Sequence, residues 1–163
     1  MAFNYYGIVT RKEIRLKNYN YLDHGYYFVT ICSHNRDCLF GEIIKKEMHL
    51  NAAGNMVQSV WSSLSQVYEG WIIDSLIVMP NHVHAVVCNV LSGNKIGLPN
   101  LIRKIKSFTA TNYKNGIELQ NWAPFHEKLW QRNYYEIIIK NRDSLHRIRK
   151  YILENPSNWN DPR

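Results

Sequence analysis

The chain has 163 residues, which fits one domain, and its 45% hydrophobic and 13% aromatic residues exclude a disordered protein. Its formal net charge of +7 and pI near 9.3 predict a positive surface suited to nucleic acid, an anionic membrane or another acidic partner. No apolar run approaches the roughly 18 residues that span a bilayer, and the first residues lack a signal-peptide pattern, so we expect no membrane association. An odd number of cysteines without metal-type spacing indicates reduced thiols in a cytoplasmic protein: Cys32, Cys38 and Cys88.

The first half of the chain predicts an arm, a strand and a helix. Residues 1–20 are basic and polar, and we expect them to form an arm that leads into a single domain over residues 21–163. Aromatic and β-branched residues over 26–32 predict a strand. Apolar residues at helical spacing over 51–68 predict a helix, which Asn51 would cap.

The second half alternates strands and helices. We predict strands over 71–79, 82–90 and 134–139, and helices over 98–113 and 143–154. The order is therefore β-α-β-β-α-β with one more helix, which is typical of an α+β, ferredoxin-like (split βαβ) fold. In that fold two helices cover one face of an antiparallel sheet. The other face stays free for the last helix and for a functional site.

A histidine pair stands at the start of the third predicted strand. His82 and His84 are two residues apart, so their side chains project from the same face of the sheet. Small apolar residues alternate with them and are suited to packing under the two helices: Val83, Ala85 and Val87. Neutral imidazoles bind divalent metals, and two of them leave coordination positions open. A His-X-His pair alone is weak support for a metal site, and Val86 in place of a third histidine excludes the histidine-triad pattern.

The last predicted helix carries Tyr151 and Asn155, which are four residues apart and share one helix face. A tyrosine can act as a nucleophile, and an amide oxygen can complete the coordination of a metal. Arg147 and Lys150 could hold phosphate groups. The plainer interpretation is a core tyrosine and an asparagine that ends the helix before Pro156.

Five short segments carry a family resemblance over residues 11–159. They read Arg-Leu-Lys-Asn-Tyr (15–19), Tyr-Phe-Val-Thr-Ile-Cys (27–32), Val-Met-Pro-Asn-His-Val-His (78–84), Leu-Trp-Gln-Arg-Asn-Tyr-Tyr-Glu (129–136) and Ile-Arg-Lys-Tyr-Ile-Leu-Glu-Asn-Pro (148–156). In this order and spacing they resemble the single-tyrosine HUH transposases, named for a His-hydrophobic-His pair. The likeness is greatest to the bacterial REP-associated tyrosine transposases.

The resemblance implies roles for the two motifs. His82 and His84 match the metal-binding pair, Tyr151 matches the nucleophile, and Asn155 matches the polar third ligand one helical turn later. It implies that the tyrosine attacks a DNA phosphodiester with the help of Mg or Mn, leaving a 5′-phosphotyrosine and a free 3′-hydroxyl. No small-molecule cofactor is implied.

The resemblance also implies a hairpin substrate flanked by a short single-stranded guide sequence. We expect contacts to the DNA backbone from basic residues of the arm, the second main helix and the tyrosine helix. These residues are Arg11, Lys12, Arg15, Lys17, Arg103, Lys104, Lys106, Lys114, Arg147 and Lys150. For each of them the competing interpretation is a solvated charged face.

Several alternatives stay open at this point. Relatives often place a histidine where this chain has Ile137, and Tyr134 and Tyr135 are rival nucleophiles. The chain could be a non-catalytic single-strand binding module on the same fold, a domesticated transposase that binds without cutting, or a metal-dependent phosphoesterase that uses water. The short end after Trp159 offers no dimerisation helix, so we expect a monomer rather than a homodimer.

Overall fold

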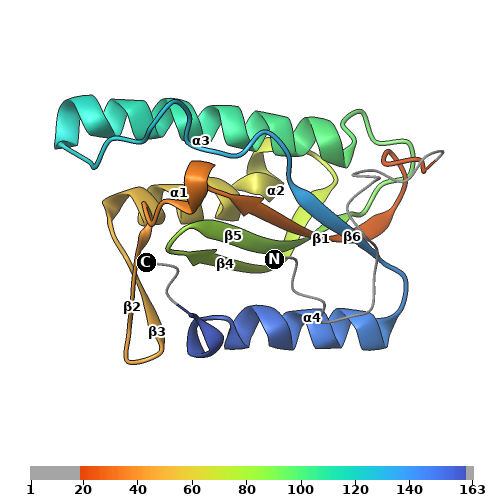
Figure 1. Ribbon diagram of the computed structural model, residues 1–163. Coiled ribbons are helices and arrows are strands. Elements are labelled where there is room, and N and C mark those ends of the chain that lie inside the picture. The colour runs from red at the N-terminus through yellow and green to blue at the C-terminus, as the bar shows by residue number, and fades with distance from the viewer. Residues whose placement is uncertain (1–18, 161–163) are drawn as a thin grey trace.

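Four antiparallel strands form the central sheet of the computed structural model, which describes residues 19–160 (Figure 1). They are β1 (Gly25–Cys32), β4 (Trp71–Met79), β5 (His82–Asn89) and β6 (Tyr135–Ile139). Their order is β4-β5-β1-β6, and each neighbouring pair is antiparallel. This is the predicted ferredoxin-like arrangement, with each strand within a residue of its expected limits. Of the predicted arm, residues 1–18 lie outside the described residues.

Helices cover both faces of the sheet. They are α1 (Ala52–Ser62), α2 (Leu64–Val67), α3 (Leu98–Gln120) and α4 (Arg142–Glu154), with short 3-10 turns η1 (His34–Arg36) and η2 (Pro156–Asn158). α1 and α3 lie over one face, and α4 crosses the other (Figure 1). The layer order confirms that the last helix occupies the face left open by the first two.

Two predicted helices differ in extent from the observed ones. The helix expected over 51–68 is broken at Ser63, whose hydroxyl donates to the Val60 carbonyl at 3.0 Å and competes with the backbone ladder. The helix expected to end at residue 113 continues to Gln120 and ends where Asn121 takes a left-handed conformation with a φ of 53°. The cap at Asn51 is confirmed, since its Oδ1 accepts from the Gly54 N–H at 2.8 Å.

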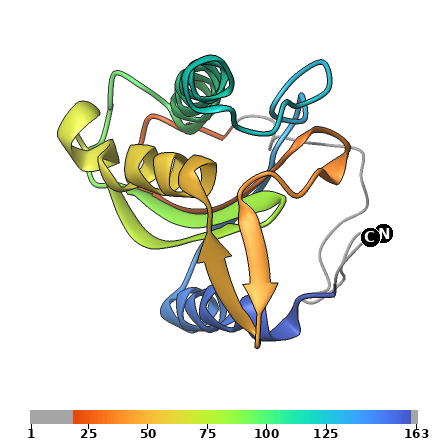
Figure 2. The ribbon, with the colours of Figure 1, turned by 90° about the vertical axis from the view of Figure 1, so that its left-hand side faces the viewer.

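A small hairpin, β2 (Gly41–Ile44) and β3 (Glu47–Leu50), was not predicted. Its turn residues Lys45 and Lys46 have φ values of 51° and 68°, as a type I′ turn requires. Such turns normally contain Asn-Gly or Asp-Gly. Because this turn contains two lysines, the sequence does not predict it. The hairpin extends away from the sheet towards the level of α4 (Figure 2), and β3 lies beside η2.

The two faces bury apolar clusters of unequal size. The larger lies under α1 and α3, includes Trp61, Trp71 and Tyr27, and takes in the predicted inward residues of β5. The smaller lies under α4 and is built on Phe28, Val86, Ile148 and Ile152. On the face that bears the histidines, α4 therefore packs on the sheet through a small apolar cluster.

An ion pair between Asp74 and Arg149 fastens α4 to the edge strand β4. Asp74 lies at an irregularity of β4, and Arg149 binds both of its carboxylate oxygens, with Nε to Oδ2 at 2.9 Å. The hydrogen bonds from Arg149 hold the pKa of Asp74 below its usual value. The Arg149 side chain is 41% exposed, so water and salt screen the pair.

We expect Asp74→Asn to lower the free energy of unfolding by about 1 kcal/mol at pH 7. Because the folded-state pKa is depressed, this stabilisation is present above the unfolded pKa of about 3.9 and is lost as the pH falls through the folded pKa. Urea unfolding at pH 7 and pH 3 measures the difference. Lys150→Ala, which breaks the exposed pair with Glu154, is the control and should cost less. An equal cost of Asp74→Asn at both pH values would contradict the assignment.

Candidate active site

The histidine pair lies at the start of β5, on the face that α4 covers. Both side chains are buried, with 7% of His82 and 5% of His84 exposed. Their Nε2 atoms are 3.0 Å apart. The turn at Pro80 and Asn81 sets this position, because the Ser33 N–H and hydroxyl both donate to the Asn81 carbonyl, at 2.9 and 3.0 Å.

Hydrogen bonds at the opposite ring nitrogens decide the protonation of each imidazole. The Asn81 Nδ2 donates to the Arg36 carbonyl at 3.1 Å, so the Asn81 Oδ1 faces His82 and accepts from its Nδ1 at 2.7 Å. The His84 Nδ1 lies 2.8 Å from the Thr30 hydroxyl. When both Nδ1 atoms carry the proton, the two Nε2 lone pairs face the same small space.

Both imidazoles are neutral at neutral pH. Burial, and after it the positive charge of Arg36, lower the pKa of His82 to about 4, while a hydrogen bond to Asn155 acts in the opposite direction. Burial also lowers the pKa of His84, helped by His82 and Arg36. Neutral imidazole is the form that binds metals.

Tyr151 meets the pair from α4. Its hydroxyl lies 3.4 Å from the His84 Nε2. Its ring meets His84 edge-on at 5.3 Å and Phe28 at 6.0 Å, while Phe28 stacks on His84 at 5.3 Å. Ile148 and Ile152, one on each side of Tyr151 in sequence, anchor this stretch of α4 in the smaller apolar cluster.

Asn155 and Trp159 complete the surroundings of His82. Asn155 directly follows α4, and its side chain hydrogen-bonds to His82. The Trp159 ring stacks on the His82 ring with centroids 5.9 Å apart and an interplanar angle of 29°. Within residues 19–160, no group of three or more His, Cys, Asp or Glu side chains could hold a metal ion. The amide of Asn155, beside His82, is the candidate for a third donor next to the two imidazoles.

The rival tyrosines lie elsewhere. Thr30 is in register with both His84 and Tyr135, so the strand β1 separates Tyr135 from the histidine. Tyr134 packs against the larger core on the other face. Ile137 belongs to the smaller cluster with Tyr151.

The predicted DNA-binding residues fall on two faces. Arg103, Lys104 and Lys114 are exposed on α3, which lies across the sheet from α4, the helix that contains Tyr151 (Figure 1). Lys106, also expected on an open face, is half-buried instead, and its Nζ donates to the Gln131 and Arg132 carbonyls at 2.6 and 3.0 Å.

The remaining basic candidates are on the tyrosine helix. Arg147 donates to the Ser144 hydroxyl at 3.1 Å, and Lys150 pairs with Glu154 at 3.7 Å. Of the candidates within the described residues, these two lie on the element that carries Tyr151. The candidates of the arm lie outside the described residues.

Sequence reasoning missed five neighbours of the site: Phe28, Thr30, Arg36, Asn81 and Trp159. Asn81 adjoins His82, so an amide next to a histidine pair was a usable signal for a partner of the ring. Phe28 and Thr30 alternate on β1 but reach the pair only through strand pairing. The other two reach it through loops, which no periodicity describes.

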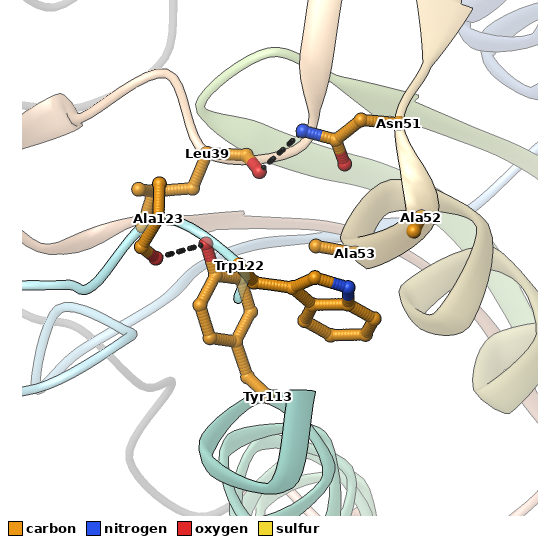
Figure 3. Close-up of a pocket in the computed structure, with 7 residues that line it drawn as sticks. All are labelled: Leu39, Asn51, Ala52, Ala53, Tyr113, Trp122 and Ala123. Carbon is orange, nitrogen blue, oxygen red and sulfur yellow. Dashed lines mark hydrogen bonds between the residues drawn. The ribbon is translucent and has the colours of Figure 1, made fainter. Parts of the chain in front are cut away.

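A separate cavity of about 150 Å³ lies beside α1 and α3 (Figure 3). Its lining is mainly apolar, and its polar side chains are used inside the fold. Asn51 donates to the Leu39 carbonyl at 3.0 Å, and the Tyr113 hydroxyl donates to the Ala123 carbonyl at 2.9 Å. This cavity offers no set of groups for catalysis.

The ferredoxin-like sheet, with a buried histidine pair under a tyrosine-bearing helix, fits a transposase, and the family comparison shows this class of protein. The chain belongs to the family described as "Transposase IS200 like", whose family model matches residues 20–155. It is 37% identical to an uncharacterized protein of Haemophilus influenzae over 168 residues, covering 94% of this chain and 92% of that one.

Two solved structures share the fold. One is a REP-associated tyrosine transposase bound to a REP hairpin, with a TM-score of 0.61 and 19% identity over 88% of this chain and 73% of that chain. The other is a putative transposase from Deinococcus radiodurans R1, with a TM-score of 0.51 and 15% identity over 87% of this chain and 98% of that chain. In the part of this chain that the structure describes, no helix is both long and apolar enough to cross a membrane.

Proposed function

We propose that this transposase is a single-stranded DNA endonuclease and strand transferase whose nucleophile is Tyr151. The observation that carries the proposal is the Tyr151 hydroxyl, 3.4 Å from the Nε2 of a buried, neutral histidine pair. The substrate is hairpin-forming single-stranded DNA, as suggested by the REP hairpin bound to the structurally similar transposase. Cys32 and Cys88 are buried thiols, in keeping with the cytoplasmic setting expected from the sequence.

The donor set fits a divalent metal such as Mg or Mn. Two ligands at right angles and about 2.1 Å from a metal are about 3.0 Å from each other. The two Nε2 atoms have that spacing, and when both rings carry their proton on Nδ1 the two Nε2 lone pairs face the same small space. Two such lone pairs repel unless a cation or a proton lies between them. His82, His84 and the Asn155 amide would hold the metal, which when bound polarises a phosphate oxygen.

The chemistry of the chain itself is the attack of the Tyr151 oxygen on phosphorus. The new phosphotyrosine bond links the protein to the 5′ side of the cut, and the bond from phosphorus to the 3′ oxygen breaks. The phenol gives up its proton, and the leaving 3′ oxygen gains one. Because a phosphodiester is exchanged for a phosphodiester, a 3′-hydroxyl can reverse the step and join strands.

A covalent-adduct assay tests the function. Hairpin-forming single strands from the DNA flanking this chain's own gene, labelled at the 3′ end, are incubated with the protein and Mn or Mg and resolved by denaturing electrophoresis. A labelled band at the mass of protein plus DNA is the expected result. Cleavage without an adduct would favour the water-using phosphoesterase, and binding without cleavage in either metal would favour a binding module or a domesticated transposase.

The histidines and Tyr151 meet within the fold of one chain, and we propose that the protein acts as a monomer. His84 and Tyr151 come from β5 and α4, and α4 packs on the sheet of its own chain. A single molecule therefore carries the nucleophile and the proposed metal ligands.

Thr30→Val should weaken Mn²⁺ binding by about 10- to 100-fold. The substitution keeps the side-chain shape but removes the hydroxyl that lies 2.8 Å from the His84 Nδ1, so the ring loses its preferred tautomer and orientation. Isothermal titration calorimetry with Mn²⁺ alone measures the change. Thr111→Val, on the exposed side of α3, is the matched control. Unchanged affinity in Thr30→Val would show that His84 is oriented by packing alone.

A further inference from the structure

Arg36 lies at the end of η1, in a loop fastened to the histidine pair. The Ser33 hydroxyl binds the carbonyls of Asp37 and Asn81, at 2.8 and 3.0 Å, and the Asn81 amide binds the Arg36 carbonyl at 3.1 Å. The same Asn81 accepts from the His82 ring. The Asn81 side chain therefore links the backbone of Arg36 directly to the ring of His82.

The loop holds two residues in an unfavourable conformation. Asn35 and Arg36 have φ values of 53° and 62°, which residues other than glycine adopt at a cost of about 1 kcal/mol or more each. Strained backbone of this kind persists where the surrounding structure enforces it, and it is concentrated at functional sites. Here the three side-chain hydrogen bonds of Ser33 and Asn81 enforce it.

The guanidinium of Arg36 brings a positive charge to the pair. Its charge contributes to lowering the pKa of both His82 and His84, and the residue is exposed to solvent. Within residues 19–160, no acidic side chain forms an ion pair with it. The positive charge of Arg36 would repel a metal ion held by His82 and His84, so the two cations together are electrostatically unfavourable. The arrangement becomes favourable when an anion lies between the two positive charges.

We propose that Arg36 binds a phosphate group of the DNA strand that lies against His82 and His84, and so acts as a phosphate-binding residue of the site. The inference rests on the proposed function, since it takes DNA as the anion. A guanidinium offers two parallel N–H donors that match two phosphate oxygens, and its charge persists at any working pH. The rigid loop holds its backbone in place before DNA arrives.

The proposal predicts effects of opposite sign on metal and on DNA. Removing the charge in Arg36→Gln lifts a repulsion, so Mn²⁺ should bind a few-fold more tightly in the absence of DNA. The same variant should bind single-stranded DNA with Mn²⁺ about 10-fold or more weakly, because a charge-assisted contact is lost. A residue that only supports the fold would not improve metal binding.

Equilibrium binding tests this. In a Tyr151→Phe background, where no adduct forms, the Kd for a fluorescein-labelled hairpin-forming single strand is measured across salt concentrations, and Mn²⁺ binding is measured by calorimetry without DNA. Arg36→Gln should lower the slope of log Kd against log salt by about 0.7, the value for one phosphate of a single strand, and Arg36→Lys should restore the slope but not the full affinity. Neither substitution changes the preference of the backbone at this position.

Lys95→Gln, an exposed lysine in the loop that follows β5, is the matched control and should change both measurements less. Unchanged DNA affinity and salt slope in Arg36→Gln, or an equal loss in Lys95→Gln, would overturn the proposal. The two proposals fail separately. A wild-type protein that forms no adduct but shows the Arg36 dependence overturns the nuclease, and an adduct-forming protein without that dependence overturns the role of Arg36.

Discussion

Replacing Tyr151 with phenylalanine is expected to abolish the covalent protein–DNA adduct and to slow strand cleavage by at least about a thousandfold. The variant loses one oxygen, the atom that would attack phosphorus. The phenyl ring keeps the edge-on contacts with Phe28 and His84, so the free energy of unfolding should change little. Denaturing electrophoresis of the labelled hairpin strand measures the adduct, and single-turnover cleavage gives the rate.

Tyr135→Phe is the matched control for this experiment. Tyr135 is on the same face of the sheet, 49% exposed, with β1 between it and the pair. It should retain the adduct and most of the cleavage rate. Cleavage that survives Tyr151→Phe but not Tyr135→Phe would move the nucleophile to β6, and cleavage that survives both would indicate attack by water.

Replacing His84 with alanine should have the second large effect, a loss of about 100-fold or more in Mn²⁺ affinity together with the loss of cleavage. His84 contacts both His82 and the Tyr151 hydroxyl through its Nε2 atom. Its Nδ1 atom lies next to the Thr30 hydroxyl. Its removal leaves one imidazole and one amide, which is too few ligands for tight binding. Calorimetry with Mn²⁺ and the adduct assay measure the two losses.

His84 is buried and stacks on Phe28, so the variant needs a check on folding. His84→Gln fills most of the same space, and circular dichroism with thermal unfolding shows whether each variant is folded. His126→Ala, at an exposed histidine, should bind Mn²⁺ like the wild type. A folded His84→Gln protein that keeps full Mn²⁺ affinity would place the metal elsewhere.

Most of the sheet and helices could be predicted from the sequence because their signals are local. Apolar residues at helical spacing located α1 and α3, and alternation along β5 separated His82 and His84 from the residues that pack in the larger core. The β2–β3 hairpin could not be predicted in this way. Its turn uses Lys45 and Lys46 in left-handed conformations, so tertiary contacts rather than turn residues determine it.

The site was predictable only as far as two short motifs extend. The His-X-His pair and the Tyr151–Asn155 spacing indicate shared faces within one element, but they do not bring the two elements together. That the tyrosine hydroxyl would stand next to His84 depends on the angle at which α4 crosses the sheet. Arg36 and Trp159 approach His82 from loops whose paths no periodic pattern records.

The unequal packing of the two sheet faces has a consequence for how the protein opens. α4 rests on the smaller apolar cluster and on the screened pair of Asp74 with Arg149, while β5 is buried along its whole length. Segments with few buried contacts detach at a lower free energy than the whole domain unfolds. The amide protons of α4 should therefore exchange with solvent sooner than those of β5. Tyr151, the proposed nucleophile, is on this segment, so we expect it to separate from the histidines at a lower free energy than the sheet needs to unfold.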